Sequence, residues 1–291
     1  MKRAPRSIAW RAYCLAAIGA ILIADSIGAR AAEPCGERID IATHGTTTTR
    51  YSIARPKDNK ANAAPVALVL LAGGGGYLNL DERGCPRALA GNSLIRSVPL
   101  FLDLGFIAVR VDSPSDHTGT DGLAGFRMTA SHAKDLGKII ADVRARTKAE
   151  IWVVGTSRGS LSAANAATRL SGPDGPNGVV LTSALTMGQA GARRSWVADT
   201  VFDLELESIR IPLLVVGHEN DSCIRTPAHL MSRIAERTNS PRRQVVTVAG
   251  GAGSAGISGV DACEAHSPHG FLGQEEEVAA GIARFIRDGR Y

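Results

Sequence analysis

The chain has 291 residues, with 33 basic and 28 acidic side chains and a formal net charge of +5. Five of the basic residues and one of the acidic residues lie in positions 1–31, so the remainder holds 28 basic and 27 acidic residues, a net charge of +1. Only 4% of the residues are aromatic. The sequence therefore excludes a nucleic-acid-binding protein, which needs a basic surface excess.

Residues 1–31 are predicted to be a signal peptide. A basic head is followed by an apolar run of 13 residues, 12–24, and then by Ala29-Arg30-Ala31, which has small residues where a signal peptidase reads them. The apolar run is too short to span a bilayer comfortably. We expect cleavage before Ala32, export to the periplasm or the medium, and no stable membrane insertion afterwards; an uncleaved anchor is the alternative.

The pattern of the remaining residues predicts an α/β fold. Apolar or alternating runs indicate strands, in chain order, at 38–43, 48–54, 66–72, 106–112, 151–155, 178–181, 211–217 and 244–248. Helical spacing occurs at 131–147, 161–170, 226–237 and 275–287. Continuous apolar strands that alternate with helices predict a mostly parallel sheet with helices on both faces. The first two strands, joined by a turn at Gly45, are expected to form an antiparallel hairpin.

Residues 32–291 are expected to form one domain without a large cap. The segment 182–210 has room for one helix and a loop only. Two further segments are predicted to lack regular structure, namely the polar linker 55–65 and the Gly-rich loop 249–260.

Residues 155–159 read Gly-Thr-Ser-Arg-Gly, the G-x-S-x-G pattern of a nucleophile elbow with Ser157 at its tip. A serine hydroxyl is a weak nucleophile, and a tight turn between strand and helix projects it toward a base and oxyanion donors. The flanking glycines leave room for the close approach of strand and helix. The apolar strand before the pattern and the small-residue helix after it favour this interpretation over an ordinary turn.

An acid and a base are expected at the carboxyl ends of later strands, because functional groups of parallel sheets gather there. Asp221 and Glu219 follow the strand 211–217, and His266 and His269 follow the strand 244–248 and its glycine-rich loop. The order serine, acid, histidine matches that of the α/β-hydrolases.

Residues 60–290 resemble the α/β-hydrolase superfamily, nearest to its lid-poor, dienelactone hydrolase-like members. The resemblance rests on GTSRG around Ser157, LLVVGHENDSC around Asp221 and SPHGF around His269. It implies that Ser157 is the nucleophile, Asp221 the acid and His269 the base. Glu219 remains an alternative acid and His266 an alternative base. The other histidines are interpreted as solvent-facing or structural: His44, His117, His132, His218 and His229.

The oxyanion hole is expected to use the backbone N–H of Arg158, which follows the nucleophile, and one from the run Gly73–Gly76. Gly74 and Gly75 are the central candidates, and the donor among the four is open. We expect no cofactor and no metal ion.

Four cysteines remain after cleavage at Ala32, an even number that favours two disulfides in an exported protein, with three possible pairings. Cys223 lies near Asp221 and Cys263 near His269. If these loops meet in a triad, Cys223 pairs with Cys263, which leaves Cys35 for Cys85.

These features predict an exported serine hydrolase that cleaves a small carboxylic ester. An amidase or peptidase with the same triad and a non-catalytic binding protein of the same fold are the alternatives. Four arginines, Arg127, Arg158, Arg193 and Arg194, either favour an acidic substrate or are surface residues. The oligomeric state is not indicated.

Overall fold

The computed structural model describes residue 1 and residues 35–57, 64–251 and 257–291. The chain divides into two units, Met1–Glu33 and Pro34–Tyr291. Except for Met1, the predicted signal peptide lies outside the described residues, as do residues 58–63 of the predicted linker and 252–256 of the Gly-rich loop. The description that follows concerns the second unit. No helix among the described residues has the length and apolar character needed to cross a membrane.

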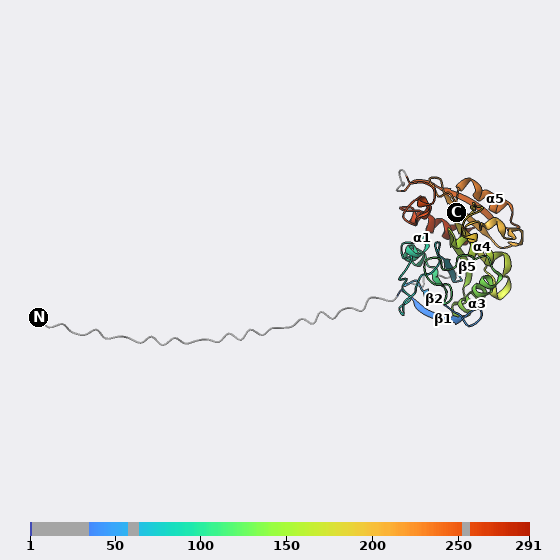
Figure 1. Cartoon of the computed structure of the whole chain (residues 1–291). Helices are drawn as coiled ribbons and strands as arrows, with labels where there is room; N and C mark the ends of the chain where they lie inside the picture. The colour runs from blue at the N-terminus through green and yellow to red at the C-terminus, as the bar shows by residue number, and fades with distance from the viewer. Residues whose placement is uncertain (2–34, 58–63, 252–256) are drawn as a thin grey trace. The chain divides into compact units, whose positions relative to one another are not determined.

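An eight-stranded sheet forms the centre of this unit (Figure 1). Its strands are β1 (Glu37–Ala42), β2 (Thr48–Ala54), β3 (Val66–Leu71), β4 (Ile107–Pro114), β5 (Glu150–Thr156), β6 (Gly178–Thr182), β7 (Leu213–His218) and β8 (Arg243–Val248). Their order across the sheet is β1-β2-β4-β3-β5-β6-β7-β8. The β1–β2 and β2–β4 pairs are antiparallel, and all other neighbours are parallel. The predicted mostly parallel sheet with an N-terminal antiparallel hairpin is confirmed.

Helices cover both faces of the sheet. The helices are α1 (Ser93–Arg96), α2 (Val98–Asp103), α3 (Ala130–Thr147), α4 (Gly159–Arg169), α5 (Met231–Glu236) and α6 (Glu275–Asp288). Apolar residues of α3, α4 and α5 belong to one core cluster, and those of α2 and α6, with Leu94 of α1, belong to another. The two clusters lie on opposite faces of the sheet.

Strand β3 shows why its residues are apolar throughout. Ala67, Val69 and Leu71 belong to the first cluster, whereas Leu68 and Leu70 belong to the second. Successive side chains of a strand point to opposite faces, so a strand buried on both sides needs apolar residues at every position. This requirement explains why the central strands were predictable to within two residues at each end.

Three regions differ from the sequence prediction. The helix expected at 226–237 is a 3-10 turn, η5 (Ala228–Leu230), followed by the shorter α5. Pro227 disfavours a helical conformation at Thr226, whose hydroxyl instead bonds to Asp221.

Between β6 and β7 there is no α-helix in residues 183–212, all of which are described; three 3-10 turns occur there, η2 (Ser195–Val197), η3 (Val201–Asp203) and η4 (Leu206–Ser208). Helices α1 and α2 were missed because four and six residues are too few to show a period.

Candidate active site

Ser157 lies at the turn between β5 and α4, with a φ of 51° in the left-handed region. A non-glycine residue in this region is strained and is held there by its surroundings. The Ser157 N–H donates to the Thr182 carbonyl (3.0 Å), and the Ser160 hydroxyl donates to the Ser157 carbonyl (2.6 Å). Both backbone groups of the serine are therefore fixed in this sharp turn between strand and helix.

The glycines of the G-x-S-x-G pattern are required by close backbone packing. A Cβ on Gly155 would lie 2.3 Å from the Gly159 carbonyl oxygen, and one on Gly159 would lie 2.0 Å from that of Leu71. Backbone atoms cannot move aside as a flexible side chain does. Strand β5, helix α4 and the end of β3 therefore meet only with glycine at both positions.

Asp221 and His269 form a buried pair. The Asp221 Oδ2 atom lies 3.0 Å from Nδ1 of His269, and the two side chains are 0% and 4% exposed. The carboxylate also accepts from the Cys223 N–H (2.9 Å) and the Thr226 hydroxyl (2.8 Å), which fixes its orientation. Nε2 of His269 is buried and has no hydrogen-bond partner among the described residues.

The alternative acid and base lie elsewhere. The side chain of Glu219 is exposed. His266 is also exposed, and its ring packs against Gly91, where a Cβ would come within 2.5 Å of it. Gly270, which follows His269, allows the tight turn: a Cβ there would lie 1.8 Å from the Ala265 carbonyl oxygen.

The end of β6 links the serine to the histidine. Thr182, its last residue, accepts the Ser157 N–H, and the next residue, Ser183, donates its hydroxyl to the His269 carbonyl (2.7 Å). Ser183 has a φ of 41°. The backbones of Ser157 and His269 are thus tied to adjacent residues at the carboxyl end of one strand. Sequence reasoning missed Ser183 and Thr226, although Ser183 lies two residues after the end of the predicted strand 178–181.

The glycine run after β3, Gly73–Gly76, lies beside Ser157. A Cβ on Gly73 would lie 3.0 Å from that of Ser157. Gly74 and Gly76 have φ values of 57° and 77°, which favour glycine. Gly75 packs against the loop after β4: its carbonyl accepts the Leu123 N–H (2.8 Å), and a Cβ on it would lie 2.4 Å from the Thr120 carbonyl oxygen.

Arg127 orients this run from inside the protein. Its guanidinium donates to the carbonyls of Ala72 (3.0 Å) and Gly74 (3.3 Å) and to the Ser162 hydroxyl (2.7 Å). In a trans peptide the C=O and N–H groups point in opposite directions. The N–H groups of Gly73 and Gly75 therefore point away from Arg127. Burial and the nearby charge of Arg158 lower the pKa of Arg127 to about 9, so the group stays cationic at neutral pH.

The other arginines have different surroundings. Arg158 is half-buried with its guanidinium carbon 4.9 Å from the centre of the Trp196 ring, and its Nη1 is buried without a hydrogen-bond partner among the described residues. Burial lowers the pKa of Arg158. Arg194 is exposed and pairs with Asp121, and Arg193 is exposed.

Two disulfides are present, Cys35–Cys85 and Cys223–Cys263. This is the pairing that proximity of the acid and base loops predicted. The second bridge joins the loop of Asp221 to the segment before His269. The Cys223 sulfur is thereby unavailable as a metal ligand, although it lies within 4.8 Å of ligand atoms of Asp221 and His269.

Two of the histidines interpreted as solvent-facing or structural, His132 and His218, are buried and form hydrogen bonds. Nε2 of His218 lies 3.0 Å from the Gly250 carbonyl oxygen, and its Nδ1 accepts the Asn220 N–H (3.0 Å). His132 lies beneath the loop after β4 with Nε2 2.9 Å from the Ser162 hydroxyl. Burial, and next the charge of Arg127, lower its pKa to about 3, so the ring is neutral.

No family model matches the sequence, and no curated protein matches it. Solved structures do match. A cold-adapted esterase from an Arctic intertidal metagenomic library is 13% identical with a TM-score of 0.53, over 87% of this chain and 93% of its own. XC6422 from Xanthomonas campestris, a serine hydrolase without a lid, is 12% identical with a TM-score of 0.51, over 87% and 94%. Est1E from Butyrivibrio proteoclasticus, solved with ferulic acid, is 17% identical with a TM-score of 0.54, over 86% and 98%. Sheet order, elbow and structural matches together show that the chain has the α/β-hydrolase fold.

Proposed function

We propose that residues 32–291 are an exported serine hydrolase that cleaves carboxylic esters, with Ser157, His269 and Asp221 as its triad. The observation that supports it best is the buried Asp221–His269 pair. Nε2 of His269 has no hydrogen-bond partner among the described residues, and the backbones of His269 and Ser157 bond to adjacent residues at the end of β6. The esterases that share the fold support ester chemistry. Two disulfides support export, because such bonds persist in oxidising compartments.

The proposed reaction proceeds in two halves. The Ser157 Oγ attacks the ester carbonyl carbon while Nε2 of His269 takes its proton, and Asp221 stabilises the imidazolium through Nδ1. The tetrahedral intermediate collapses, and the leaving alcohol takes the proton from His269. Water then attacks the acyl-enzyme with His269 again as base, which releases the acid and restores the serine.

The oxyanion is proposed to accept the Arg158 N–H and one N–H of the glycine run. Of the two predicted glycines, Gly75 is favoured over Gly74, because its N–H points away from the anchoring Arg127. Gly73 has the same orientation and lies against Ser157, so it joins Gly75 as a candidate. A single such donor is typically worth about 3 kcal/mol of transition-state stabilisation.

Two alternatives use the same residues. An amidase or peptidase would use the same triad, but the short turns between β6 and β7 offer little to select a peptide. A non-catalytic binding protein would leave every one of these roles unused. An acidic substrate stays a prediction, supported now by Arg158 and not by Arg127, whose guanidinium bonds to the protein itself.

Active-site labelling tests the proposal. A fluorophosphonate probe is expected to label the wild-type protein at Ser157, identified by mass spectrometry, and to leave Ser157→Ala unlabelled. The matched control is Ser222→Ala, an exposed serine that should label as the wild type does. Hydrolysis of p-nitrophenyl butyrate should be lost with the same variant. Labelling at another residue would overturn the assignment of Ser157, and no turnover of short esters by the wild type would favour the binding protein.

A further inference from the structure

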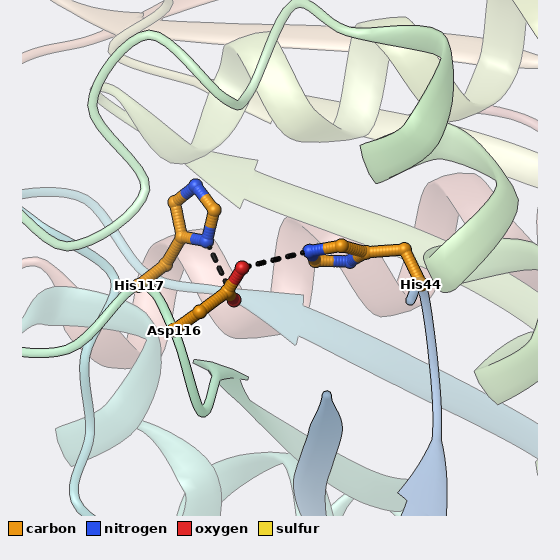
Figure 2. Close-up of side chains that lie close together, drawn as sticks. All are labelled: His44, Asp116 and His117. Atoms are coloured by element: carbon orange, nitrogen blue, oxygen red, sulfur yellow. Dashed lines mark hydrogen bonds and ion pairs between the residues drawn. The ribbon is translucent and has the colours of Figure 1, made fainter. Parts of the chain in front are cut away.

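A second cluster of ionisable side chains lies outside the proposed triad (Figure 2). His44 follows β1 in the turn before β2, while Asp116 and His117 follow β4. The two turns belong to neighbouring strands: the Ser115 N–H donates to the Thr48 carbonyl (2.9 Å). The three side chains therefore come together from two segments far apart in sequence.

The donor atoms of the cluster are close to one another. Nε2 of His44 lies 3.0 Å from Oδ2 of Asp116, and Nδ1 of His117 lies 2.8 Å from Oδ1. One ligand atom from each residue lies within 4.8 Å of the others. Zinc–nitrogen and zinc–oxygen bonds of about 2.0–2.1 Å place tetrahedral ligand atoms roughly 3.3 Å apart, so an ion needs only small side-chain adjustments. The side chains are 23%, 43% and 23% exposed, which leaves room for water as a fourth ligand.

A buried carboxylate outside the cluster orients His44. Asp135, on α3, has a side chain that is 4% exposed, and its Oδ2 lies 2.5 Å from Nδ1 of His44. Both ring nitrogens of His44 face a carboxylate, Asp135 at Nδ1 and Asp116 at Nε2. With a metal ion bound at Nε2, Asp135 would accept the Nδ1–H and orient the ring. Histidines that bind a metal usually donate their other N–H to a carboxylate or carbonyl in this way.

The surroundings hold the imidazoles in place. The Phe126 ring packs against His44 and His117, with ring centres 4.8 Å and 4.1 Å away. Lys138 of α3 donates to the Thr43 carbonyl (2.7 Å), which ties the His44 turn to the helix that carries Asp135. Because both rings are positioned before any ion arrives, binding would cost little side-chain entropy.

We propose that His44, Asp116 and His117 bind one divalent transition-metal ion of the zinc type, with Asp135 as the positioning residue of His44. Two imidazoles and one carboxylate suit zinc or cobalt, whereas magnesium and calcium prefer oxygen ligands alone. The ion would clamp the turn before β2 to the loop after β4. That loop donates the Leu123 N–H to the Gly75 carbonyl, so the ion would brace the loop that supports the glycine run. The inference does not depend on the proposed hydrolase activity.

Calorimetric titration of tag-free, chelator-treated protein with ZnCl2 tests the site. We expect one zinc ion per chain, visible bands of tetrahedral cobalt when Co²⁺ replaces zinc, and no comparable binding of Mg²⁺. His44→Ala and His117→Ala should each weaken zinc binding at least 100-fold, and Asp135→Asn about 10- to 100-fold. His229→Ala, which changes an exposed histidine elsewhere, should bind as the wild type does.

His269→Ala separates this site from the triad, because zinc also binds catalytic histidines. It should keep the full stoichiometry. Unfolding temperatures of all variants in chelator report whether the fold is retained; the His44 and His117 side chains are equally exposed, at 23% each. Absence of zinc binding by the wild type overturns the proposal, as does binding that survives His117→Ala or disappears with His269→Ala.

Discussion

Asp221 bonds to His269 because the turn after β7 directs its carboxylate inward. The Asp221 N–H donates to the His218 carbonyl (3.1 Å), and the side chain is then held by the Cys223 N–H and the Thr226 hydroxyl. Glu219 lies two residues earlier in the same turn, and its side chain is exposed. Which of two nearby carboxylates faces the histidine depends on the path of the turn, and sequence spacing alone does not determine that path.

Replacing the acid tests this assignment. Asp221→Asn is expected to lower kcat for ester hydrolysis by about 10³- to 10⁴-fold, because the amide no longer holds the imidazole in the required tautomer or stabilises its cation. Glu219→Gln should change kcat less than twofold. Steady-state kinetics on one p-nitrophenyl ester measure both. Equal losses in the two variants would contradict the role given to Asp221.

At the scale of elements, the Cys223–Cys263 bridge joins the loop after β7 to the segment before His269. The Cys35–Cys85 bridge joins the segment before β1 to the loop after β3, and both cysteines lie far from Asp221 and His269 in sequence. Two bridges of similar loop length, 40 and 50 residues, thus differ in which loops they constrain.

This difference gives a matched pair of variants. Replacing both cysteines of either bridge by serine should lower the free energy of unfolding by about 2–4 kcal/mol. Without the bridge the unfolded chain gains conformational entropy, and the gain is similar for two loops of such similar length. Only Cys223→Ser with Cys263→Ser should also reduce kcat, because the acid and base loops are then free to separate. Urea unfolding and kinetics in parallel measure the two effects. A loss of kcat in the Cys35 and Cys85 pair alone would contradict this account.

The sheet was predictable from the sequence because burial on both faces forces long apolar runs, as in β3 and β5. The start of α5 was not, because Pro227 and the Thr226 hydroxyl interrupt a pattern that looks helical from residue 226 by spacing alone. The elbow, acid and base could be proposed from strand ends. Arg127 could not, since its bonds to Ala72 and Gly74 join residues more than 50 positions apart. The His44 cluster was missed for the same reason.

For the whole molecule, His132 couples pH to folding. Its pKa is lowered to about 3 in the folded protein, first by burial and then by the charge of Arg127. The unfolded chain has an ordinary histidine, with a pKa of about 6.5. Between pH 6.5 and about 3, His132 is protonated in the unfolded state and neutral in the folded state. The contribution of His132 is therefore complete above pH 6.5 and is lost as the pH falls toward 3.

The expected loss is measurable. Between pH 7 and pH 5 this one group should cost roughly 2 kcal/mol of unfolding free energy. The variant His132→Gln has no titrating group at this position. Its free energy of unfolding should therefore fall by about 2 kcal/mol less than that of the wild type between pH 7 and pH 5. Urea unfolding of both proteins at the two pH values, in the presence of a chelator, gives the comparison. Parallel losses in wild type and variant would show that another group dominates.

The charge of Arg158, the residue after Ser157, lies close enough to lower the pKa of Arg127, whose guanidinium bonds to the carbonyls of Ala72 and Gly74. A neutral ligand leaves the repulsion between these two charges in place, whereas we expect a negative charge formed at Ser157 to offset it. Compounds that acquire charge only on attachment to the serine, such as boronic acids, would gain this relief together with the covalent bond. Neutral ketones of the same shape would gain less, because their adducts depend on the backbone N–H groups to stabilise an alkoxide that forms less readily.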